Sequence, residues 1–256
     1  MFGLEPHYGC CTANLSQGFP KFALCAFAHN GDMVMNTLPV PSKLTAKNCE
    51  VEIVTDYPFK NRFLYKIKAK KAFTFKIRIP SFAKNLTVDG EESDYKMLTV
   101  TLEAGEGREI EISFDADTEL IDRPYDLKSV KRGSLVFALP IAYDKKMYEY
   151  ETNGVVRKFP YCDYEYIGRG DWNYGFSDVC WEVEEREIDE YPFSSTNPAV
   201  VVKAKMKKIP WGHERFFEYI CAREPSSREA IGEEEAKELY PYGNARLRMT
   251  EMPLVD

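Results

Sequence analysis

Hydrophobic and polar residues alternate along the chain from about residue 32 onward. In the segment AFTFKIRIP, residues 72–80, apolar side chains fall on one face and polar ones on the other, and the final proline ends the run. Such a period of two is typical of a half-buried β-strand. The segments FLYKIKA, MLTVTL and REIEISF repeat it, with Asp89-Gly90 and Gly105-Glu106-Gly107 as turns. Several short strands at this spacing predict an antiparallel β-sandwich that ends near residue 120.

A helical period precedes these strands. Residues 12–29 carry apolar side chains at intervals close to 3.6 residues, and Asn30-Gly31 supplies a stop. Pro20 is expected to kink this helix, because its ring clashes with the carbonyl group of Ser16. A single helix with so much apolar surface needs other helices to cover it, and no such helices follow it.

The second half of the chain opens with a polar, turn-rich segment. Residues 121–133, IDRPYDLKSVKRG, predict a linker, and strand character resumes in SLVFALPIAY, AVVVKAKMKKIP and FEYICA. Residues 226–240 predict a short helix with a serine cap and glutamates in its first turns. We therefore expect a helical segment at 1–30, a β-sandwich domain at 31–121 and a second β-rich domain at 122–256.

Composition and charge exclude several classes of protein. Apolar residues make up 44% of the 256 residues and aromatic residues 14%, which is ample for a packed core. The net charge is −7 and the chain has no long Lys/Arg block, which argues against a nucleic-acid ligand. No apolar run approaches the roughly 20 residues of a membrane helix. The N-terminus shows no basic region followed by an apolar stretch, so we expect no signal peptide.

The chain has seven cysteines, and only Cys10 and Cys11 are close in sequence. An odd number with this spacing indicates buried thiols in a reducing compartment rather than a disulfide framework. The sequence therefore predicts a cytoplasmic protein.

The vicinal pair lies in EPHYGCCTANLSQGFPKF, residues 5–22. A thiolate is both a nucleophile and a ligand that zinc prefers, but structural zinc takes four donors. The local candidates for the others are His7 and Glu5, and their spacing matches no common zinc motif. Taken alone, the pair favours two small buried residues at a helix start. A redox or metal-relay site is a further hypothesis, although the C-x-x-C spacing is missing.

The surrounding residues add a resemblance to a known family. The segment GCCTANLSQGFPKF resembles the Cys-Cys-x-x-Asn segment of glycoside hydrolase family 127 (GH127) and its relatives, formerly domain of unknown function 1680, which include β-L-arabinofuranosidases. The resemblance continues in the same order through FTFKIRIPSFAKN, VKRGSLVFALPI, DWNYGF, VVVKAKMKKIPWG and LYPYGNARLRMTEMP. Matches in register over nearly the whole chain are much more specific than two cysteines.

The resemblance implies a fold. In that family an N-terminal (α/α)6 barrel carries the active site, and β-sandwich domains follow it. The chain would then be a C-terminal portion with a mainly β fold: a β-sandwich plus a second β-rich domain, preceded by a helical remnant of the barrel. Residues 1–30 would hold the last barrel helix, and the cysteines would stand at the start because the chain begins where the barrel ends.

The resemblance also implies a site. Cys10 would be the nucleophile of a retaining glycosidase, and a Glu would act as acid and then as base. Cys10 and Cys11 would bind Zn²⁺ together with a Glu and a Cys of the barrel, and His7 would contact the carbohydrate substrate. Because the barrel residues have no counterpart here, we expect the isolated chain to be inactive and to hold zinc weakly or not at all.

Three positions depart from the characterised members. Thr12-Ala13 replaces a Pro-Pro pair, and Gln17 replaces an Arg. These differences bear on the arabinose specificity rather than on the fold. The competing hypothesis from another class is a non-catalytic β-sandwich module that stabilises the barrel or binds carbohydrate.

Other chemistry-bearing residues have simpler interpretations. A run of aromatic residues is expected to be mainly core, with a sugar-stacking platform as the alternative, and an acidic run is expected to be a solvated strand face. Glu233–Glu235 is expected to be an exposed helix turn, and His213 a loop residue. The aromatic run is Tyr161, Tyr164, Tyr166, Trp172, Tyr174, Phe176 and Trp181, and the acidic run is Glu182, Glu184, Glu185 and Glu187.

Overall fold

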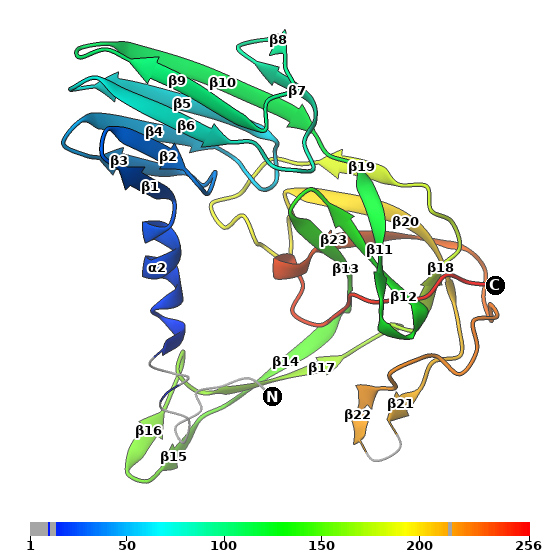
Figure 1. The fold of residues 1–256 in the computed structure, drawn as a ribbon. Helices are drawn as coiled ribbons and strands as arrows, with labels where there is room; N and C mark the ends of the chain where they lie inside the picture. Colours follow the sequence, from blue (N-terminus) through cyan, green and yellow to red (C-terminus); the bar gives the residue numbers. More distant parts are fainter. Residues whose placement is uncertain (1–9, 11–13, 215–216) are drawn as a thin grey trace. The chain divides into compact units, whose positions relative to one another are not determined.

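The structure, a computed structural model, describes Cys10 and residues 14–214 and 217–256. The described chain divides into two compact units, one that ends at Asp117 and one that spans Thr118–Asp256 (Figure 1). β-strands make up nearly all of the regular secondary structure of both units, so the mainly β fold that the sequence predicts is confirmed. Among the described residues, no helix has the length and apolar character needed to cross a membrane.

The first unit contains two sheets. The four-stranded sheet has the order β1-β2-β6-β9, with β2 and β6 parallel, and the six-stranded sheet has the order β3-β4-β5-β10-β7-β8. The strands of the first sheet are β1 (Phe27–Asn30), β2 (Met33–Asn36), β6 (Phe73–Arg78) and β9 (Met97–Leu102). Those of the second are β3 (Ser42–Thr45), β4 (Cys49–Thr55), β5 (Arg62–Ala69), β10 (Gly107–Asp115), β7 (Lys84–Val88) and β8 (Glu91–Glu92).

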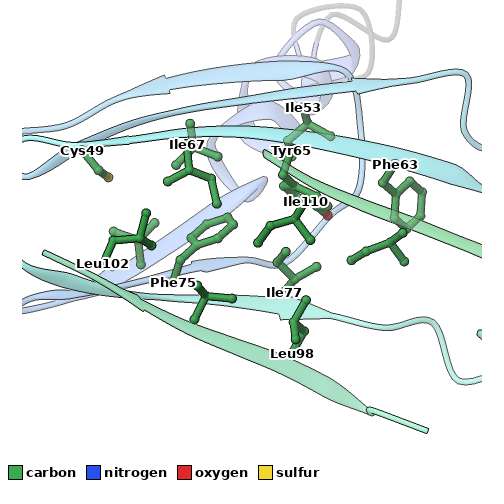
Figure 2. Close-up of a cluster of buried hydrophobic side chains, with 14 of the residues drawn as sticks. Cys49, Ile53, Phe63, Tyr65, Ile67, Phe75, Ile77, Leu98, Leu102 and Ile110 are labelled. Carbon is green, nitrogen blue, oxygen red and sulfur yellow. The ribbon is translucent and has the colours of Figure 1, made fainter. Parts of the chain in front are cut away.

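The core of this unit lies between the two sheets (Figure 2). Alternate residues of each strand point inward, as the period of two predicts. The rings of Tyr65 on β5 and Phe75 on β6 meet edge to face with 5.9 Å between centroids, so they join the two sheets directly. The predicted β-sandwich is therefore present.

One polar side chain is buried at the edge of this core. Asn36 at the end of β2 is 1% exposed. The Tyr65 hydroxyl donates to Asn36 Oδ1 at 2.9 Å, and Asn36 Nδ2 donates to the carbonyl oxygens of Ala26 and Leu38 at 2.9 and 2.8 Å. Each of these three bonds supplies a partner inside the fold, which a buried polar group requires.

The helix before the sandwich is shorter than the predicted span of 12–29, of which residues 12 and 13 lie outside the described residues. Helix α2 covers Gly18–Leu24, and residues 27–30 form strand β1 instead. Asn14 and Leu15 are also helical, and the helical path is interrupted by a turn at Ser16 and Gln17 before α2 begins. This interruption lies where the ring of Pro20 was expected to clash with the Ser16 carbonyl group, and Pro20 itself falls in the first turn of α2, where a backbone N–H has no partner within the helix. The apolar side chains of Phe19 and Leu24 are both 80% exposed, and no residue of α2 is buried.

The second unit is built on an eight-stranded sheet. Its main path runs β11-β12-β13-β23-β20-β18, while β19 pairs with β20 and β24 with β13. The strands are β11 (Thr118–Arg123), β12 (Leu127–Arg132), β13 (Leu135–Pro140), β23 (Glu235–Pro241), β20 (Val200–Lys208), β18 (Tyr174–Phe176), β19 (Glu182–Glu185) and β24 (Arg248–Met249). Two 3₁₀ turns, η1 (Pro124–Asp126) and η2 (Tyr242–Asn244), follow β11 and β23.

The segment 121–133 is not the linker that the sequence predicts. It is the end of β11, the turn η1 and strand β12, which pair as a hairpin inside the second unit. Its polar residues are held by one another, since Lys128 Nζ lies 2.7 Å from Asp122 and 2.8 Å from Asp126. Its apolar residues Leu127 and Val130 are buried. The two units meet at Asp117 and Thr118 in the sequence, within a few residues of the expected boundary at 121.

The predicted helix at 226–240 is also absent. Residues 235–241 form β23, which pairs with β20 so that Leu239 lies opposite Val202. Both side chains are fully buried. The core position of this strand outweighs the weak local preference of a glutamate-rich segment for a helix.

Three two-stranded ribbons complete the second unit. Exposed apolar side chains gather on the first two of them, and Tyr161, in the connection between them, is 67% exposed. The ribbons are β14 (Tyr143–Tyr148) with β17 (Asp163–Gly168), β15 (Tyr150–Thr152) with β16 (Val155–Arg157), and β21 (His213–Glu214) with β22 (Phe217–Cys221).

Candidate functional site

Cys10, the predicted nucleophile, has a helical backbone and an exposed side chain. Asn14 Nδ2 donates a hydrogen bond to the Cys10 carbonyl oxygen at 2.7 Å. Gln17 Nε2 in turn donates to Asn14 Oδ1 at 2.9 Å. The asparagine of the Cys-Cys-x-x-Asn segment therefore supports the backbone that carries Cys10, and Gln17 supports that asparagine.

The other predicted site residues, Cys11 and His7, lie outside the described residues, as does Glu5. Across the described residues, no three His, Cys, Asp or Glu side chains are grouped so that they could hold a metal ion. The donor types of the segment nevertheless suit zinc, because thiolates and an imidazole are ligands that it prefers. Two thiolates and one imidazole amount at most to three donors, whereas a closed zinc site takes four.

The pKa values of five carboxyl groups of the described residues depart from the ordinary value. Each one whose pKa departs from its ordinary value has it lowered, and these groups are Glu50, Asp126, Asp178, Glu184 and Glu235. For Glu235 the main cause is a hydrogen bond from Lys237, with a further one from the Tyr174 hydroxyl. A general acid at neutral pH needs the opposite shift. None of these five residues has the electrostatic environment of the acid/base glutamate.

The aromatic run does not form a continuous platform. Tyr174 and Phe176 on β18 are buried, so the core interpretation is confirmed for them, but it is wrong for the exposed Tyr161. Trp172 lies 5.8 Å from Trp211 and 5.4 Å from the ring of His213, measured between centroids. His213 begins strand β21 rather than lying in a loop.

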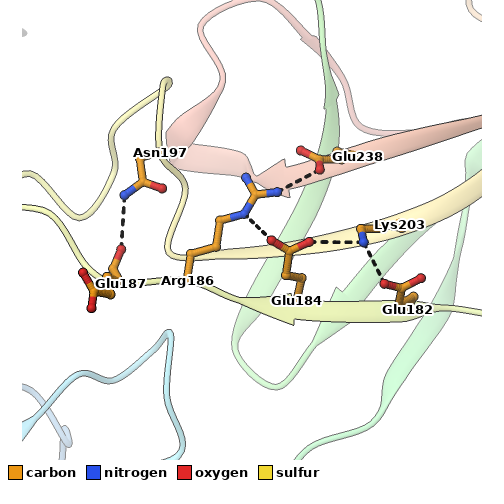
Figure 3. Close-up of polar contacts among 7 residues, drawn as sticks. All are labelled: Glu182, Glu184, Arg186, Glu187, Asn197, Lys203 and Glu238. Atoms are coloured by element: carbon orange, nitrogen blue, oxygen red, sulfur yellow. Dashed lines mark hydrogen bonds and ion pairs between the residues drawn. The ribbon is translucent and has the colours of Figure 1, made fainter.

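The acidic run lies on and just after strand β19, and its side chains are partly solvated, as predicted. Figure 3 shows that several of them belong to an ion-pair network. Lys203 lies 2.7 Å from Glu182 and 3.2 Å from Glu184, and Arg186 lies 2.8 Å from both Glu184 and Glu238. The hydrogen bonds from Arg186 and Lys203 lower the pKa of Glu184. Because these carboxylates pair within the sheet, they are structural groups rather than a ligand site.

Glu233 and Glu234 are exposed, as the sequence predicts, but the segment Glu233–Glu235 is not a helix turn. Glu234 accepts a hydrogen bond from Ser177 Oγ at 2.9 Å, and Glu235 begins strand β23. Both glutamates are therefore held against neighbouring strands of the second unit.

A cleft of about 510 Å³ in the second unit was not predicted from the sequence. We call it the Tyr242 cleft. The side chains of Phe193 and Tyr242 on it are about half exposed. Arg123 Nε lies 2.7 Å from Glu251 Oε1, and both residues line the cleft. These two residues are 128 positions apart, so no local pattern could have joined them. The lining residues are Ile121, Arg123, Ser129, Ser134, Leu135, Val136, Phe193, Pro241, Tyr242, Gly243, Thr250 and Glu251.

Comparisons with known proteins show the fold. Neither a model of a known protein family nor a curated protein matches the chain. A GH127 β-L-arabinofuranosidase from Geobacillus stearothermophilus T6 matches over 96% of this chain and 36% of its own, with 17% identity and a TM-score of 0.58.

Two further solved structures match in the same way. A glycoside hydrolase matches over 96% of this chain and 40% of its own, with 19% identity and a TM-score of 0.59. A GH127 β-arabinofuranosidase matches over 99% of this chain and 40% of its own, with 14% identity and a TM-score of 0.52. The chain therefore has the β-rich fold of a portion of GH127-type glycoside hydrolases, as its sequence resemblance predicts. It spans about two fifths of the length of these structures.

Proposed function

We propose that the chain is the C-terminal part of a retaining glycoside hydrolase that acts on L-arabinofuranosyl or related plant-glycan linkages. The observation that carries this proposal is the likeness of 96% of the chain to a GH127 β-L-arabinofuranosidase. The segment Cys10-Cys11-x-x-Asn14 supports it. We further propose that the rest of the parent protein includes an (α/α)6 barrel. The exposed apolar side chains of α2, Phe19 among them, support a helical partner, because burying them removes apolar surface from water.

In the proposed reaction the Cys10 thiolate attacks the anomeric carbon of the sugar. The glycosidic C–O bond breaks, and a barrel glutamic acid gives its proton to the leaving oxygen. The same glutamate, now ionised, then takes a proton from water. That water attacks the anomeric carbon and releases the thiolate, so the configuration is retained. Asn14 would orient the turn that carries Cys10, and His7 would contact the sugar.

We also propose that Cys10 and Cys11 hold Zn²⁺ together with a Glu and a Cys of the barrel. Bound zinc keeps a thiol deprotonated at neutral pH, which a sulfur nucleophile needs. The isolated chain offers at most two thiolates and the His7 imidazole. Its zinc affinity is therefore expected to be weak, since the ligand set is incomplete and ordering the segment costs entropy.

Activity tests the catalytic proposal. The parent protein should hydrolyse an aryl β-L-arabinofuranoside, and Cys10→Ser should abolish this activity. Cys180→Ser, which alters another exposed cysteine, is the matched control and should remain active. The isolated chain should be slower by at least the roughly 10²–10⁴-fold that general acid catalysis contributes. Turnover by the isolated chain that depends on Cys10 would contradict the assignment of the acid to the barrel, and an inactive parent would contradict the glycosidase itself.

Metal content tests the ligand assignment separately. Elemental analysis should find about one zinc per parent protein, lost in Cys11→Ala, and much less than one in the isolated chain. A stoichiometric zinc in the isolated chain that disappears in Cys11→Ala would instead indicate a local site with Glu5 and His7.

Two further points accompany the proposal. Among the cysteines that the structure describes, Cys49 and Cys162 are buried but Cys10, Cys25 and Cys180 are exposed, so the expectation of mostly buried thiols is wrong. The proposal of a reducing compartment such as the cytoplasm rests on the odd number and the spacing of the cysteines. A carbohydrate-binding accessory module is the second candidate function, and the observation that favours it is the Tyr242 cleft.

A further inference from the structure

The Tyr242 cleft has the composition of a small-molecule site. Such sites usually measure about 300–1,000 Å³ and are lined by apolar and aromatic side chains with a few polar groups. The cleft, at about 510 Å³, lies within this range. Its apolar lining includes the rings of Tyr242 and Phe193, and its polar groups include Arg123, Glu251 and Ser134.

The two aromatic side chains are held in place by the backbone around them. A Cβ atom on Gly243 would lie 2.6 Å from the Phe193 ring, so the glycine allows this ring to pack directly on the main chain. Asn244 Nδ2 donates to the Ser194 carbonyl oxygen at 2.6 Å, which ties the Phe193 segment to η2. The Arg248 guanidinium lies 3.5 Å from the centre of the Tyr242 ring. Both rings are therefore positioned without a ligand, which reduces the entropy that binding would cost.

The polar groups of the cleft retain unused hydrogen-bonding capacity. The contact between Arg123 and Glu251 uses Nε of the arginine and Oε1 of the glutamate. Within the part of the chain that the structure describes, the two Nη groups of Arg123 and Oε2 of Glu251 make no other hydrogen bond. Donors and an acceptor thus stand side by side, an arrangement that suits a pair of neighbouring hydroxyl groups.

The charged residues that line the cleft balance each other. Arg123 and Glu251 are the charged residues of its lining, and they have opposite signs and pair with each other. A neutral ligand can bond to the Nη groups of Arg123 and to Oε2 of Glu251 without breaking this pair, whereas a carboxylate that reaches Arg123 also meets the Glu251 carboxylate. The Arg248 guanidinium on the Tyr242 ring is a further positive charge beside the cleft. A ligand with an apolar face for an aromatic ring and several neutral hydroxyl groups satisfies every part of the cleft, and sugars have this structure.

We propose that the Tyr242 cleft binds a neutral sugar residue of a glycan chain. One face of the sugar packs against Tyr242, and neighbouring hydroxyl groups bond to Arg123 and Glu251. This binding site uses no residue of the cysteine segment, so it does not depend on the proposed glycosidase activity. Sugar binding should accordingly persist in Cys10→Ser.

Calorimetric titration of the chain with arabinotriose, xylotriose and trigalacturonate tests the proposal. At least one of the two neutral trisaccharides should bind, and the acidic one should bind more weakly. Tyr242→Ala should weaken binding about 3–10-fold through loss of ring contact, and Arg123→Ala should also weaken it. The matched controls are Tyr161→Ala, an exposed tyrosine outside the cleft, and Arg62→Ala, an exposed arginine that pairs with Glu111 in the first unit.

Ser134→Trp provides a second variant that leaves the rings and the ion pair intact. Ser134 is exposed in the turn before β13, so the indole fills the cleft without entering the core. It should abolish binding while the unfolding transition stays unchanged. Absence of binding by both neutral sugars, unchanged affinity in Tyr242→Ala and Ser134→Trp, or tighter binding of trigalacturonate would each overturn the proposal.

Discussion

The two units of this chain use β-strands in different ways. In the sandwich of the first unit the inward residues of long strands such as β5 and β6 are almost completely buried between two sheets. The most exposed apolar side chains of this unit gather on and just before α2, where Phe19 and Leu24 are both 80% exposed. The second unit has a buried core as well, but it also exposes large apolar side chains on its ribbons and loops. Exposed apolar groups of this kind indicate surfaces that contact ligands or partners. Among these exposed side chains are Val156, Phe159, Tyr161, Tyr191 and Phe193.

The outer surface of the sandwich strengthens the contrast. On the six-stranded sheet, Lys43, Glu52, Lys66 and Glu109 lie directly opposite one another on four successive strands. Opposite charges in neighbouring cross-strand positions are mildly stabilising and keep a sheet face solvated. The sandwich of the first unit therefore has a closed core and a charged sheet face, whereas the second unit carries the aromatic cleft.

The largest expected effect lies in the sandwich core. Phe75→Ala removes a ring that is 0% exposed and that contacts Tyr65 across the two sheets. We expect the free energy of unfolding of the first unit to fall by about 3–5 kcal/mol, measured by denaturant titration. Val54→Ala, on the outer face of β4, is the control and should change it by less than about 0.5 kcal/mol. Similar effects for both variants would show that the first unit is not a closed core.

The buried polar contact should have the next largest effect. Asn36→Ala leaves the Tyr65 hydroxyl without its partner and removes two bonds to backbone carbonyls, so the free energy of unfolding should fall by about 2–3 kcal/mol.

Burial raises the pKa of Tyr65 above its ordinary value of 10.0. Folding therefore favours the neutral phenol, and the contribution of Tyr65 to the stability of the folded state is lost as the pH rises above about 10. Tyr65→Phe should reduce the loss of stability at alkaline pH, measured as the free energy of unfolding against pH. An unchanged profile in this variant would contradict the role of the Tyr65 hydroxyl.

A comparable test of the second unit concerns Gly175 on β18. A Cβ atom there would lie 2.9 Å from Val255 and 3.1 Å from the Pro253 carbonyl oxygen. The C-terminal segment also bonds to this strand, since the Phe176 N–H donates to that carbonyl oxygen at 2.9 Å. Gly175→Ala should therefore cost about 1–3 kcal/mol by overpacking. Gly212→Ala, which meets no atom within 4 Å, is the control, and equal stability of the two variants would show that the C-terminal segment adjusts freely.

The smallest effect is expected in the ion-pair network of Figure 3. Arg186→Ala breaks contacts with Glu184 and Glu238 that remain partly solvated, so the midpoint of thermal unfolding should fall by about a degree or two at most. Folding lowers the pKa of Glu184. Its carboxylate therefore contributes to stability at pH values above its ordinary pKa, and this contribution is lost as the pH falls through the lowered pKa of the folded state. The difference in the midpoint of thermal unfolding between Arg186→Ala and the unaltered chain should accordingly become smaller in acid and in high salt. A difference that persists in 1 M salt would contradict an electrostatic origin.

Local patterns predicted the first unit well. The alternation of Phe73, Phe75 and Ile77 specifies which face of β6 is buried, because successive side chains of a strand point to opposite sides. The start of the candidate site was also predicted, since the resemblance singled out Cys10 and Asn14, which a hydrogen bond joins. That Gln17 holds the side chain of Asn14 was not predicted.

The sequence by itself therefore determined the strand period, the sandwich and the resemblance that points to Cys10. The tertiary structure decided where α2 ends, that residues 121–133 form a hairpin and that residues 235–241 form a strand. In each case strand pairing outweighed a weak local preference. β1 pairs with β2 and β11 with β12 in local hairpins, whereas β23 pairs with β20, which is distant in the sequence. The Tyr242 cleft arises in the same way, because the sheet brings Arg123 to Glu251 and packing on Gly243 places Phe193 beside Tyr242.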